Sequence, residues 1–281
     1  MPPMVGTLRR AIDRKREEVA RSKAALSFGE LEATVLQAER ARNLFSAATH
    51  HATRGHVSLI AEVVWRDRRG EWLRPEYETE QSRDAGAIAK RLAANGAAAL
   101  SCVTDEAGGG HVRDIERMKE AAGLPVLRRD LVIDPWQLWE SRAAGADGVV
   151  LTAEALREGE MVDMLILAQQ LGLTSVLEAH SMESLLRARP HVGFPHPSYA
   201  LLSINNLDLH SGAVEMGHTL RLVDLVEDTG ILLSAGGVRG REDVLALRKA
   251  GVRIVLAGEE LMRLDDPGKG VAAMLGRVAR G

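Results

Sequence analysis

After Gly55 the chain alternates short apolar runs with longer amphipathic segments. The apolar runs are rich in Val, Ile, Leu and Ala and are hydrophobic at nearly every position, which is typical of strands buried on both faces of a parallel sheet. Eight such runs occur, at Ser58–Val63, Ala98–Val103, Pro125–Leu127, Gly148–Leu151, Thr174–Leu177, Leu201–Ile204, Gly230–Ser234 and Ile254–Ala257. The pattern therefore predicts eight parallel strands.

The segments between these runs predict helices that cover the sheet, because their apolar residues recur with the helical period. Several end at a glycine just before the next strand, where a left-handed residue closes a helix at little steric cost. The predicted helices are Ala85–Asn95, Val112–Ala122, Pro135–Ala144, Met161–Leu171, Met182–Ala188, Thr219–Glu227, Arg241–Ala250 and Pro267–Val278.

Eight strand–helix units are the number that closes a parallel sheet into a barrel. A doubly wound open sheet is the alternative, but the residues after the first strand form no glycine-rich phosphate loop. We therefore predict an α/β fold, a (β/α)8 TIM barrel of one domain. Residues 55–281 form the barrel, and residues 1–54 form a short N-terminal helical extension with amphipathic helices over Val5–Ser22 and Phe28–Ala41.

Composition and charge narrow the possible partners. The net charge of -3 at pH 7 argues against a large basic surface for nucleic acid or an anionic membrane. The one cysteine, Cys102, fits a reducing compartment, and no apolar run approaches the length of a membrane span. We expect a soluble, cytoplasmic protein with no nucleic-acid or membrane partner, and its oligomeric state stays open.

Charged and amide residues stand at the ends of several predicted strands, where a TIM barrel builds its active site. Glu62 lies at the first strand, Arg129 follows the third, Glu178 follows the fifth and Asn205 follows the sixth. Any one of them could belong to a structural ion pair that fills the top of the barrel. The three charged residues together favour a catalytic site. A metal site that adds His180 is less favoured, because no paired His or Cys spacing supports it.

The sequence resembles the indole-3-glycerol phosphate synthase family in blocks that keep the family's order and spacing, over nearly the whole chain. The blocks are SLIAEV (Ser58–Val63), LPVLRRDLVIDPWQLWESRAAGADGVVL (Leu124–Leu151), LEAHS (Leu177–Ser181), INNLDL (Ile204–Leu209) and AGEELMR (Ala257–Arg263). Members of this family are TIM-barrel carboxy-lyases of tryptophan biosynthesis. They close an indole ring on an anthranilate-derived ribulose phosphate, with loss of carbon dioxide and water. We expect a small-molecule substrate, no cofactor and no bound metal.

The resemblance also implies roles for individual residues. Glu62 and Glu178 match the family's first- and fifth-strand glutamates, and Arg129 stands where the family has its general-acid lysine. These three are the expected catalytic residues. The expected substrate-binding residues are Asn205, which matches the sixth-strand asparagine, Trp65 as a wall for ring stacking, Ser234, and the backbone N–H donors Gly236, Gly237 and Gly258.

Several family residues of this working face are missing. Val64 replaces a lysine, Leu207 replaces an arginine, and Glu260 replaces a serine of the phosphate site. Arg129 itself stays protonated at physiological pH, so it binds anions but does not readily donate a proton. Because the losses gather on the working face while the barrel blocks survive, the sequence favours a diverged activity over the standard ring closure.

Three interpretations stay open. The favoured one is an enzyme acting on a small anthranilate-like or other aromatic carboxylate without a phosphate. Arg129 would then hold the carboxylate, and Glu62 or Glu178, with a raised pKa, would act as acid and base. The alternatives are a genuine indole-3-glycerol phosphate synthase and a catalytically silent barrel that serves as a binding or scaffold protein. The proline-containing segment Arg189–Tyr199 is interpreted as a lid or an interface.

Overall fold

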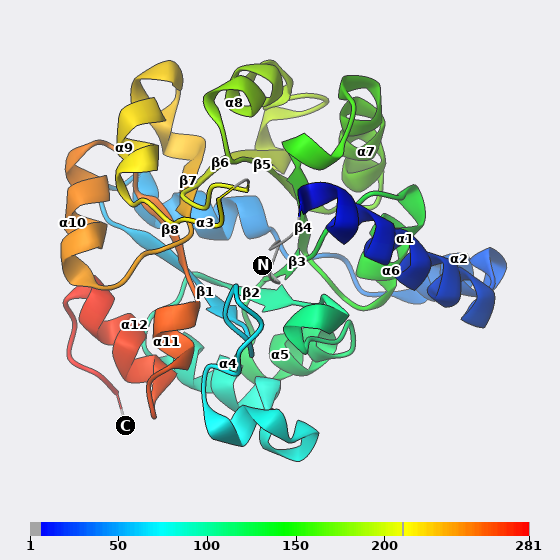
Figure 1. The fold of residues 1–281 in the computed structure, drawn as a ribbon, viewed down its shortest axis with the longest axis horizontal. Helices are drawn as coiled ribbons and strands as arrows, with labels where there is room; N and C mark the ends of the chain where they lie inside the picture. Colours follow the sequence, from blue (N-terminus) through cyan, green and yellow to red (C-terminus); the bar gives the residue numbers. More distant parts are fainter. Residues whose placement is uncertain (1–6, 210, 281) are drawn as a thin grey trace.

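Eight parallel strands close into a barrel in the order in which they occur along the chain (Figure 1). The computed structural model describes residues 7–209 and 211–280. The strands are β1 (Ser58–Val63), β2 (Ala99–Val103), β3 (Val126–Arg129), β4 (Gly148–Thr152), β5 (Thr174–Ala179), β6 (Ala200–Asn205), β7 (Leu232–Ala235) and β8 (Ile254–Ala257). The predicted TIM barrel is confirmed, and β1 and β8 have the predicted bounds.

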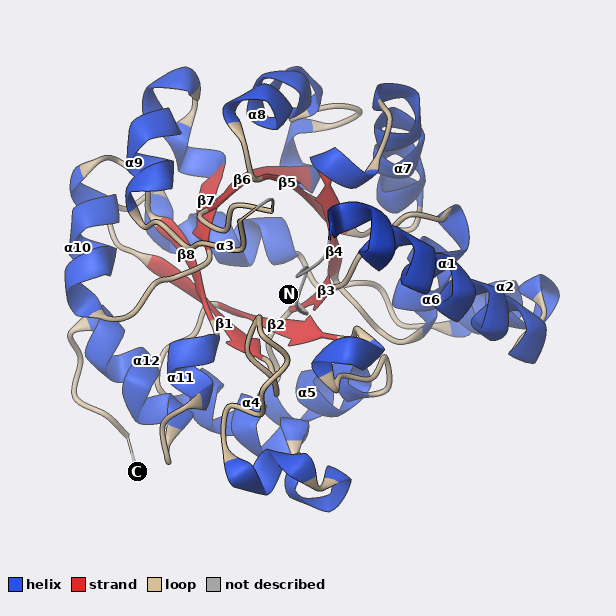
Figure 2. Cartoon of the chain, viewed as in Figure 1, coloured by secondary structure: helices blue, strands red, loops and turns tan. Residues whose placement is uncertain are grey.

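Helices follow each strand and form a ring around the barrel, drawn in blue around the red strands in Figure 2. They are α4 (Ala85–Ala94), α5 (Asp114–Ala122), α6 (Pro135–Ala143), α7 (Glu158–Gln170), α8 (Met182–Ala188), α9 (Gly217–Leu222), α10 (Arg241–Lys249), α11 (Glu259–Met262) and α12 (Pro267–Leu275). Local signals fix the ends of several. Asp134 caps α6, which has Pro135 in its first turn, and α5 ends at Gly123 with φ of 68°. Among the described helices, none is both long and apolar enough to cross a bilayer.

A helix that the sequence pattern did not predict, α3 (Leu44–Ala52), closes the N-terminal end of the barrel. Its buried Leu44 packs with inward-facing strand residues such as Ile60, Leu127 and Leu201. The predicted second helix, Phe28–Ala41, is the shorter α2 (Phe28–Gln37). The sequence contains no distinct helical pattern over α3, because the stability of this helix comes from packing against the barrel.

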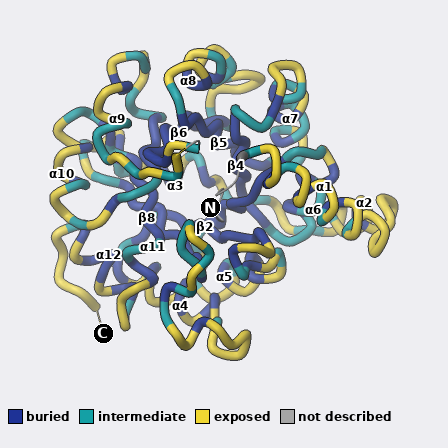
Figure 3. Tube along the Cα trace, in the orientation of Figure 1, coloured by how far each residue is buried: buried dark blue, intermediate teal, exposed yellow. Residues whose placement is uncertain are grey.

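The remaining helix of the N-terminal extension, α1 (Thr7–Ala25), lies across the opposite, C-terminal side of the barrel (Figure 1). From there α2 runs out over α6, where the rings of Phe28 and Trp139 meet edge to face at 5.2 Å between centroids. Much of α2 is exposed, as Figure 3 shows in yellow.

The segment Arg189–Tyr199 joins α8 to β6 and therefore lies at the N-terminal end of the barrel. Its short helix Pro197–Tyr199 contacts α3, which closes that end. The interpretation of this segment as a lid over the working face is wrong, because the polar strand ends lie at the opposite side.

Candidate functional site

Three charged side chains meet at the C-terminal end of the barrel, as the sequence predicts. Arg129 Nη1 lies 2.9 Å from Glu178 Oε2, and its Nη2 donates to Glu178 Oε1 at 3.3 Å. On the other side, Arg129 Nε lies 3.0 Å from Glu62 Oε1. All three residues are buried. The strands β1, β3 and β5 thus deliver one arginine between two carboxylates.

The ion pair between Arg129 and Glu178 keeps both of these side chains charged. Burial raises the pKa of Glu178, but the charge of Arg129 and its hydrogen bonds, with the nearby His180, outweigh burial and lower that pKa overall. Burial lowers the pKa of Arg129, and the charges of Glu178 and Glu62 reverse this and raise it. The prediction of a raised pKa at Glu178 is therefore wrong: its carboxylate stays ionised and paired.

Behind the triad, His180 connects Glu178 with Glu154, a residue of the loop after β4. His180 Nε2 lies 3.5 Å from Glu178 Oε1, and its Nδ1 lies 3.2 Å from Glu154 Oε2. Glu154 also accepts hydrogen bonds from the backbone N–H of His180 and from the hydroxyl of Ser184. Across residues 7–209 and 211–280, no three His, Cys, Asp or Glu side chains form a group that could hold a metal ion.

In front of the triad lies a cavity of about 240 Å³. Its lining residues are Glu62, Arg68, Arg129, Asn205, Leu207, Val214, Met216, Gly236, Gly237, Val238, Arg239, Leu256, Ala257, Gly258, Glu259 and Glu260. The structure therefore brings six of the expected site residues to one cavity: Glu62, Arg129, Asn205, Gly236, Gly237 and Gly258. Glu178 does not line it, because it lies behind Arg129 with 1% of its surface exposed.

Two expected substrate-binding residues lie elsewhere. Trp65 is 1% exposed and packs edge to face on Tyr77, with 5.1 Å between ring centroids, in the apolar layer between strands and helices. The Ser234 hydroxyl is fully buried and lies 2.8 Å from Thr219 Oγ1 and 3.3 Å from Asn206 Nδ2. Neither side chain is available to a ligand, so these two predictions are wrong.

The glycines of the cavity allow the chain to approach its neighbours closely. Gly236 and Gly237 have φ of +80° and +75°, which residues other than glycine rarely adopt. A Cβ at Gly258 would lie 2.7 Å from Glu62 Oε2. Asn205, the neighbour of Gly236, is held in place because its Oδ1 accepts the backbone N–H of Leu207 at 3.0 Å.

Arg68, on the loop between β1 and α4, lines the cavity but was not among the predicted site residues. This loop is ordered by an antiparallel bridge between Arg66 and Trp72, and the Arg66 guanidinium lies 3.9 Å from the Trp72 ring centroid. Arg68 lines the cavity together with Glu259 and Glu260, which begin α11. The charged run Arg66–Arg69 was the available signal, but a loop's position cannot be derived from its composition.

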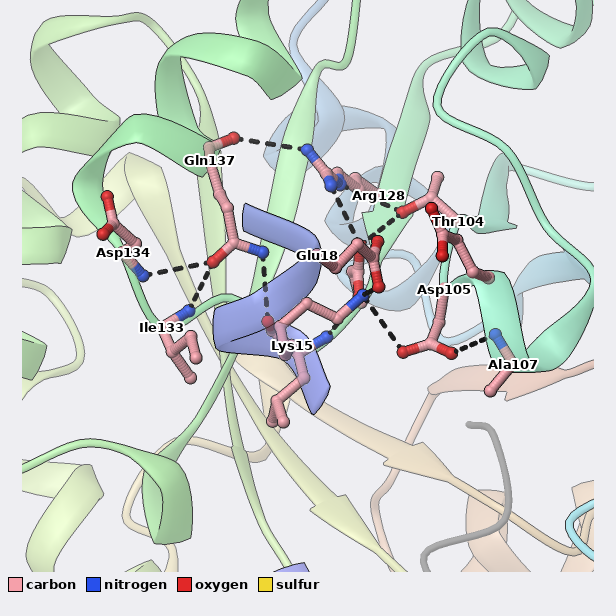
Figure 4. A network of polar contacts seen from close by, with 12 residues as sticks. Lys15, Glu18, Thr104, Asp105, Ala107, Arg128, Ile133, Asp134 and Gln137 are labelled. Atoms are coloured by element: carbon pink, nitrogen blue, oxygen red, sulfur yellow. Dashed lines mark hydrogen bonds and ion pairs between the residues drawn. The ribbon is translucent and has the colours of Figure 1, made fainter. Parts of the chain in front are cut away.

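A second charged group, also overlooked, lies under α1 (Figure 4). Lys15 is 1% exposed, and its Nζ lies 2.7 Å from Asp130 Oδ1, 2.7 Å from Glu18 Oε2 and 3.1 Å from Asp105 Oδ2. Arg128 pairs with the other oxygen of Asp130 at 2.9 Å. We call Lys15, Glu18, Asp105, Arg128 and Asp130 the α1 anchor, because these residues fasten the N-terminal helix to the ends of β2 and β3.

The fold and this cavity define a TIM-barrel protein whose polar strand ends and ligand-sized opening share one face. The model of the family described as indole-3-glycerol phosphate synthase matches residues 8–274. The chain belongs to that family, as the resemblance in its sequence blocks predicts.

Curated relatives agree over nearly their full lengths. The chain is 35% identical to indole-3-glycerol phosphate synthase of Acidithiobacillus ferrooxidans, with 94% of this chain and 97% of the relative covered. It is 36% identical to the Burkholderia ambifaria enzyme (96% and 99% covered). It is 33% identical to that of Rhodospirillum rubrum (97% and 100% covered).

Solved structures support the fold alone. A 3-hexulose-6-phosphate synthase superposes with a TM-score of 0.61 at 14% identity, covering 79% of this chain and all of that one. A variant of the tryptophan synthase α-subunit from Pyrococcus furiosus gives a TM-score of 0.56 at 14% identity, covering 79% and 98%.

Proposed function

We propose that this chain is a diverged enzyme of the indole-3-glycerol phosphate synthase family that acts on a small aromatic carboxylate without a phosphate. Glu62 lines the cavity and is its acid–base group, and Arg129 holds the two glutamates in place. We expect it not to perform the standard decarboxylating ring closure.

The observation that carries this proposal is the absence of lysine from the cavity. All the lysines of the chain, at positions 15, 23, 90, 119, 249 and 269, lie in the described residues, and none lines the cavity. An ammonium group whose pKa shifts on burial donates a proton far more readily than a guanidinium. A cavity with arginine and no lysine is therefore poorly suited to lysine-dependent acid catalysis.

The position of Arg129 strengthens this argument. Both Nη atoms are directed to Glu178, and Nε lies beside Glu62, so the guanidinium is already neutralised by protein carboxylates. This differs from the expectation that Arg129 binds the substrate carboxylate in bidentate fashion. We instead assign Arg129 a positioning role between the two glutamates.

Charge argues against a sugar phosphate. Glu259 and Glu260 line the cavity on the side of β8, and carboxylates there repel a phosphate dianion. A substrate without a phosphate suits this lining better than an aryl-ribulose phosphate.

Standard ring closure remains a second candidate, because the relatives at 33–36% identity are named indole-3-glycerol phosphate synthase. A direct assay separates the two. The purified protein is incubated with the anthranilate-derived ribulose phosphate, and indole-3-glycerol phosphate is followed by its fluorescence. We expect no turnover and no saturable binding of the sugar phosphate. Turnover would overturn the proposal and establish the synthase reaction.

A double variant, Val64→Lys with Arg129→Lys, serves as the matched partner in this assay. Both substitutions restore residue types that the family carries at these positions. A gain of turnover in the variant alone would show that the cavity accommodates the sugar phosphate, and would overturn the proposal of a substrate without a phosphate while supporting the loss of the lysine acid. Absence of turnover in both proteins, together with binding of small aromatic carboxylates, would support the proposal.

A further inference from the structure

The charged residues that line the cavity divide into paired and unpaired groups. Glu62 and Arg129 belong to the triad, and Arg239 is paired with Asp243 at 3.1 Å on the outer surface. Among the described residues, the side chains of Arg68, Glu259 and Glu260 form no ion pair and no hydrogen bond. The cavity therefore offers one guanidinium and two carboxylates that no ion pair among the described residues occupies, although the charge of Glu260 acts on Arg239.

These unpaired charges face a common space. Arg68 and Glu259 both line the cavity, and burial raises the pKa of Glu259. Their charges interact, but no N···O distance between them is within 4.0 Å. The gap between a cation and an anion that do not touch is suited to a ligand that carries the opposite charge at each end.

The rest of the lining is apolar. Leu207 and Val214 come from the loop after β6, where they form an antiparallel bridge, and Met216 follows them. Val238, in the loop after β7, and Leu256, on β8, complete this surface. An apolar wall of this kind accepts a hydrophobic or aromatic group, and the flexible methionine adapts to its shape.

We propose that the ligand of this cavity is a zwitterion of the α-amino acid type with an apolar, aromatic side chain. Arg68 holds its carboxylate, and Glu259 and Glu260 hold its ammonium group. This inference rests on the proposed function and deepens it, because it replaces the general class of aromatic carboxylates by one that also carries an amine. It makes Arg68 the specificity-determining residue of the β1 loop.

Three probes that differ by one charged group test the proposal. L-Phenylalanine carries both groups, 3-phenylpropionate only the carboxylate, and 2-phenylethylamine only the ammonium. Their affinities are measured by calorimetry at pH 7, with ligand-observed NMR for weak binding. We expect L-phenylalanine to bind most tightly, since each charge-assisted contact contributes about tenfold in affinity.

Variants assign each charge to its residue. Arg68→Gln is expected to weaken L-phenylalanine and 3-phenylpropionate about tenfold and to leave 2-phenylethylamine unchanged. Glu260→Gln and Glu259→Gln are expected to weaken the binding of L-phenylalanine and 2-phenylethylamine about tenfold and to leave that of 3-phenylpropionate unchanged. Arg69→Gln, on the same loop but outside this cavity, is the matched control and leaves all three affinities unchanged.

The outcomes also separate this inference from the proposed function. Tighter binding of 3-phenylpropionate than of L-phenylalanine would overturn the ammonium site while the proposed carboxylate substrate stands. An equal loss of all three probes in Arg68→Gln would overturn the role of Arg68. Failure of all three probes to bind the unmodified protein would overturn the inference, whereas the proposed function falls only with turnover in the fluorescence assay.

Discussion

Two groups of charged residues share the C-terminal side of this barrel, and they differ in whether their charges are matched. In the α1 anchor, Lys15 is surrounded by three carboxylates and shielded from water. In the cavity, Arg68 and Glu259 face an open space without forming a pair. Both groups include charged residues that follow strand ends, but only in the α1 anchor do the protein's own side chains pair with them.

The difference is a guide to what each group does. A matched, buried cluster has little capacity left for a ligand, and its removal leaves uncompensated charge in the interior. Unmatched charges at an opening cost little stability and can be satisfied by a molecule from solution. The α1 anchor therefore governs stability, and the cavity governs binding.

The largest effect is expected from Lys15→Met. The substitution keeps the length of the side chain and removes the ammonium group, so Asp105 and Glu18 lose their partner in a buried site. We expect a loss of about 3–5 kcal/mol in the free energy of unfolding, measured with denaturant. The control is Lys23→Met on the same helix, whose exposed pair with Asp134 contributes at most about 1 kcal/mol. Equal effects of the two would contradict the comparison.

A smaller loss is expected from Gly258→Ala, at the wall of the cavity. The added Cβ would lie 2.9 Å from Glu62 Cβ and 2.7 Å from Glu62 Oε2, so Glu62 must move away from Arg129. Overpacking of this kind costs about 1–3 kcal/mol. Gly159→Ala in α7, where a new Cβ meets no atom within 4 Å, is the control. A Gly258→Ala protein as stable as that control would show that Glu62 has room to move.

The pH dependence of stability tests Glu18 in the α1 anchor. Burial, partly offset by Lys15, raises its pKa from 4.5 to about 7 in the folded protein. Because the folded state then binds the proton more tightly than the unfolded state, the contribution of Glu18 is most favourable below pH 4.5 and is lost as the pH rises to about 7. Glu18→Gln should remove this part of the slope in denaturant unfolding from pH 4.5 to 8. An unchanged slope would contradict the assignment.

The smallest change in stability is expected from Arg68→Gln. With no ion pair to lose, its free energy of unfolding should stay within about 0.5 kcal/mol of that of the unmodified protein. A loss comparable to that of Lys15→Met would show that Arg68 has a structural partner. The cavity would then no longer differ from the α1 anchor in having an unpaired charge.

The strands could be predicted from the sequence because their signal is local. A continuous apolar run such as Ile254–Ala257 can be recognised as a buried strand without knowing which residues lie beside it in the fold. Glu62 and Arg129 were also placed correctly, since residues at strand ends meet in a closed barrel. Trp65 was misplaced because its position after β1 does not reveal that its ring turns into the helix layer.

Lys15 was missed for a different reason. On an amphipathic helix of the N-terminal extension, a lysine is ordinarily a solvent-facing residue. Its partners Asp105 and Asp130 follow the ends of β2 and β3, and only the closed barrel brings them together. Long-range pairs of this kind have no signature within a single window of sequence.

The closure of the barrel by α3 determines where a ligand can enter and leave. Leu44 and the inward-facing Ile60, Leu201 and Ile254 are completely buried, so the route through the barrel axis is blocked at that end. A molecule that reaches Glu62 must therefore arrive and depart past the same rim, which carries Arg68. Exchange with the surroundings is then controlled by the loops of that rim, and changes in their length would alter residence time without altering the barrel beneath them.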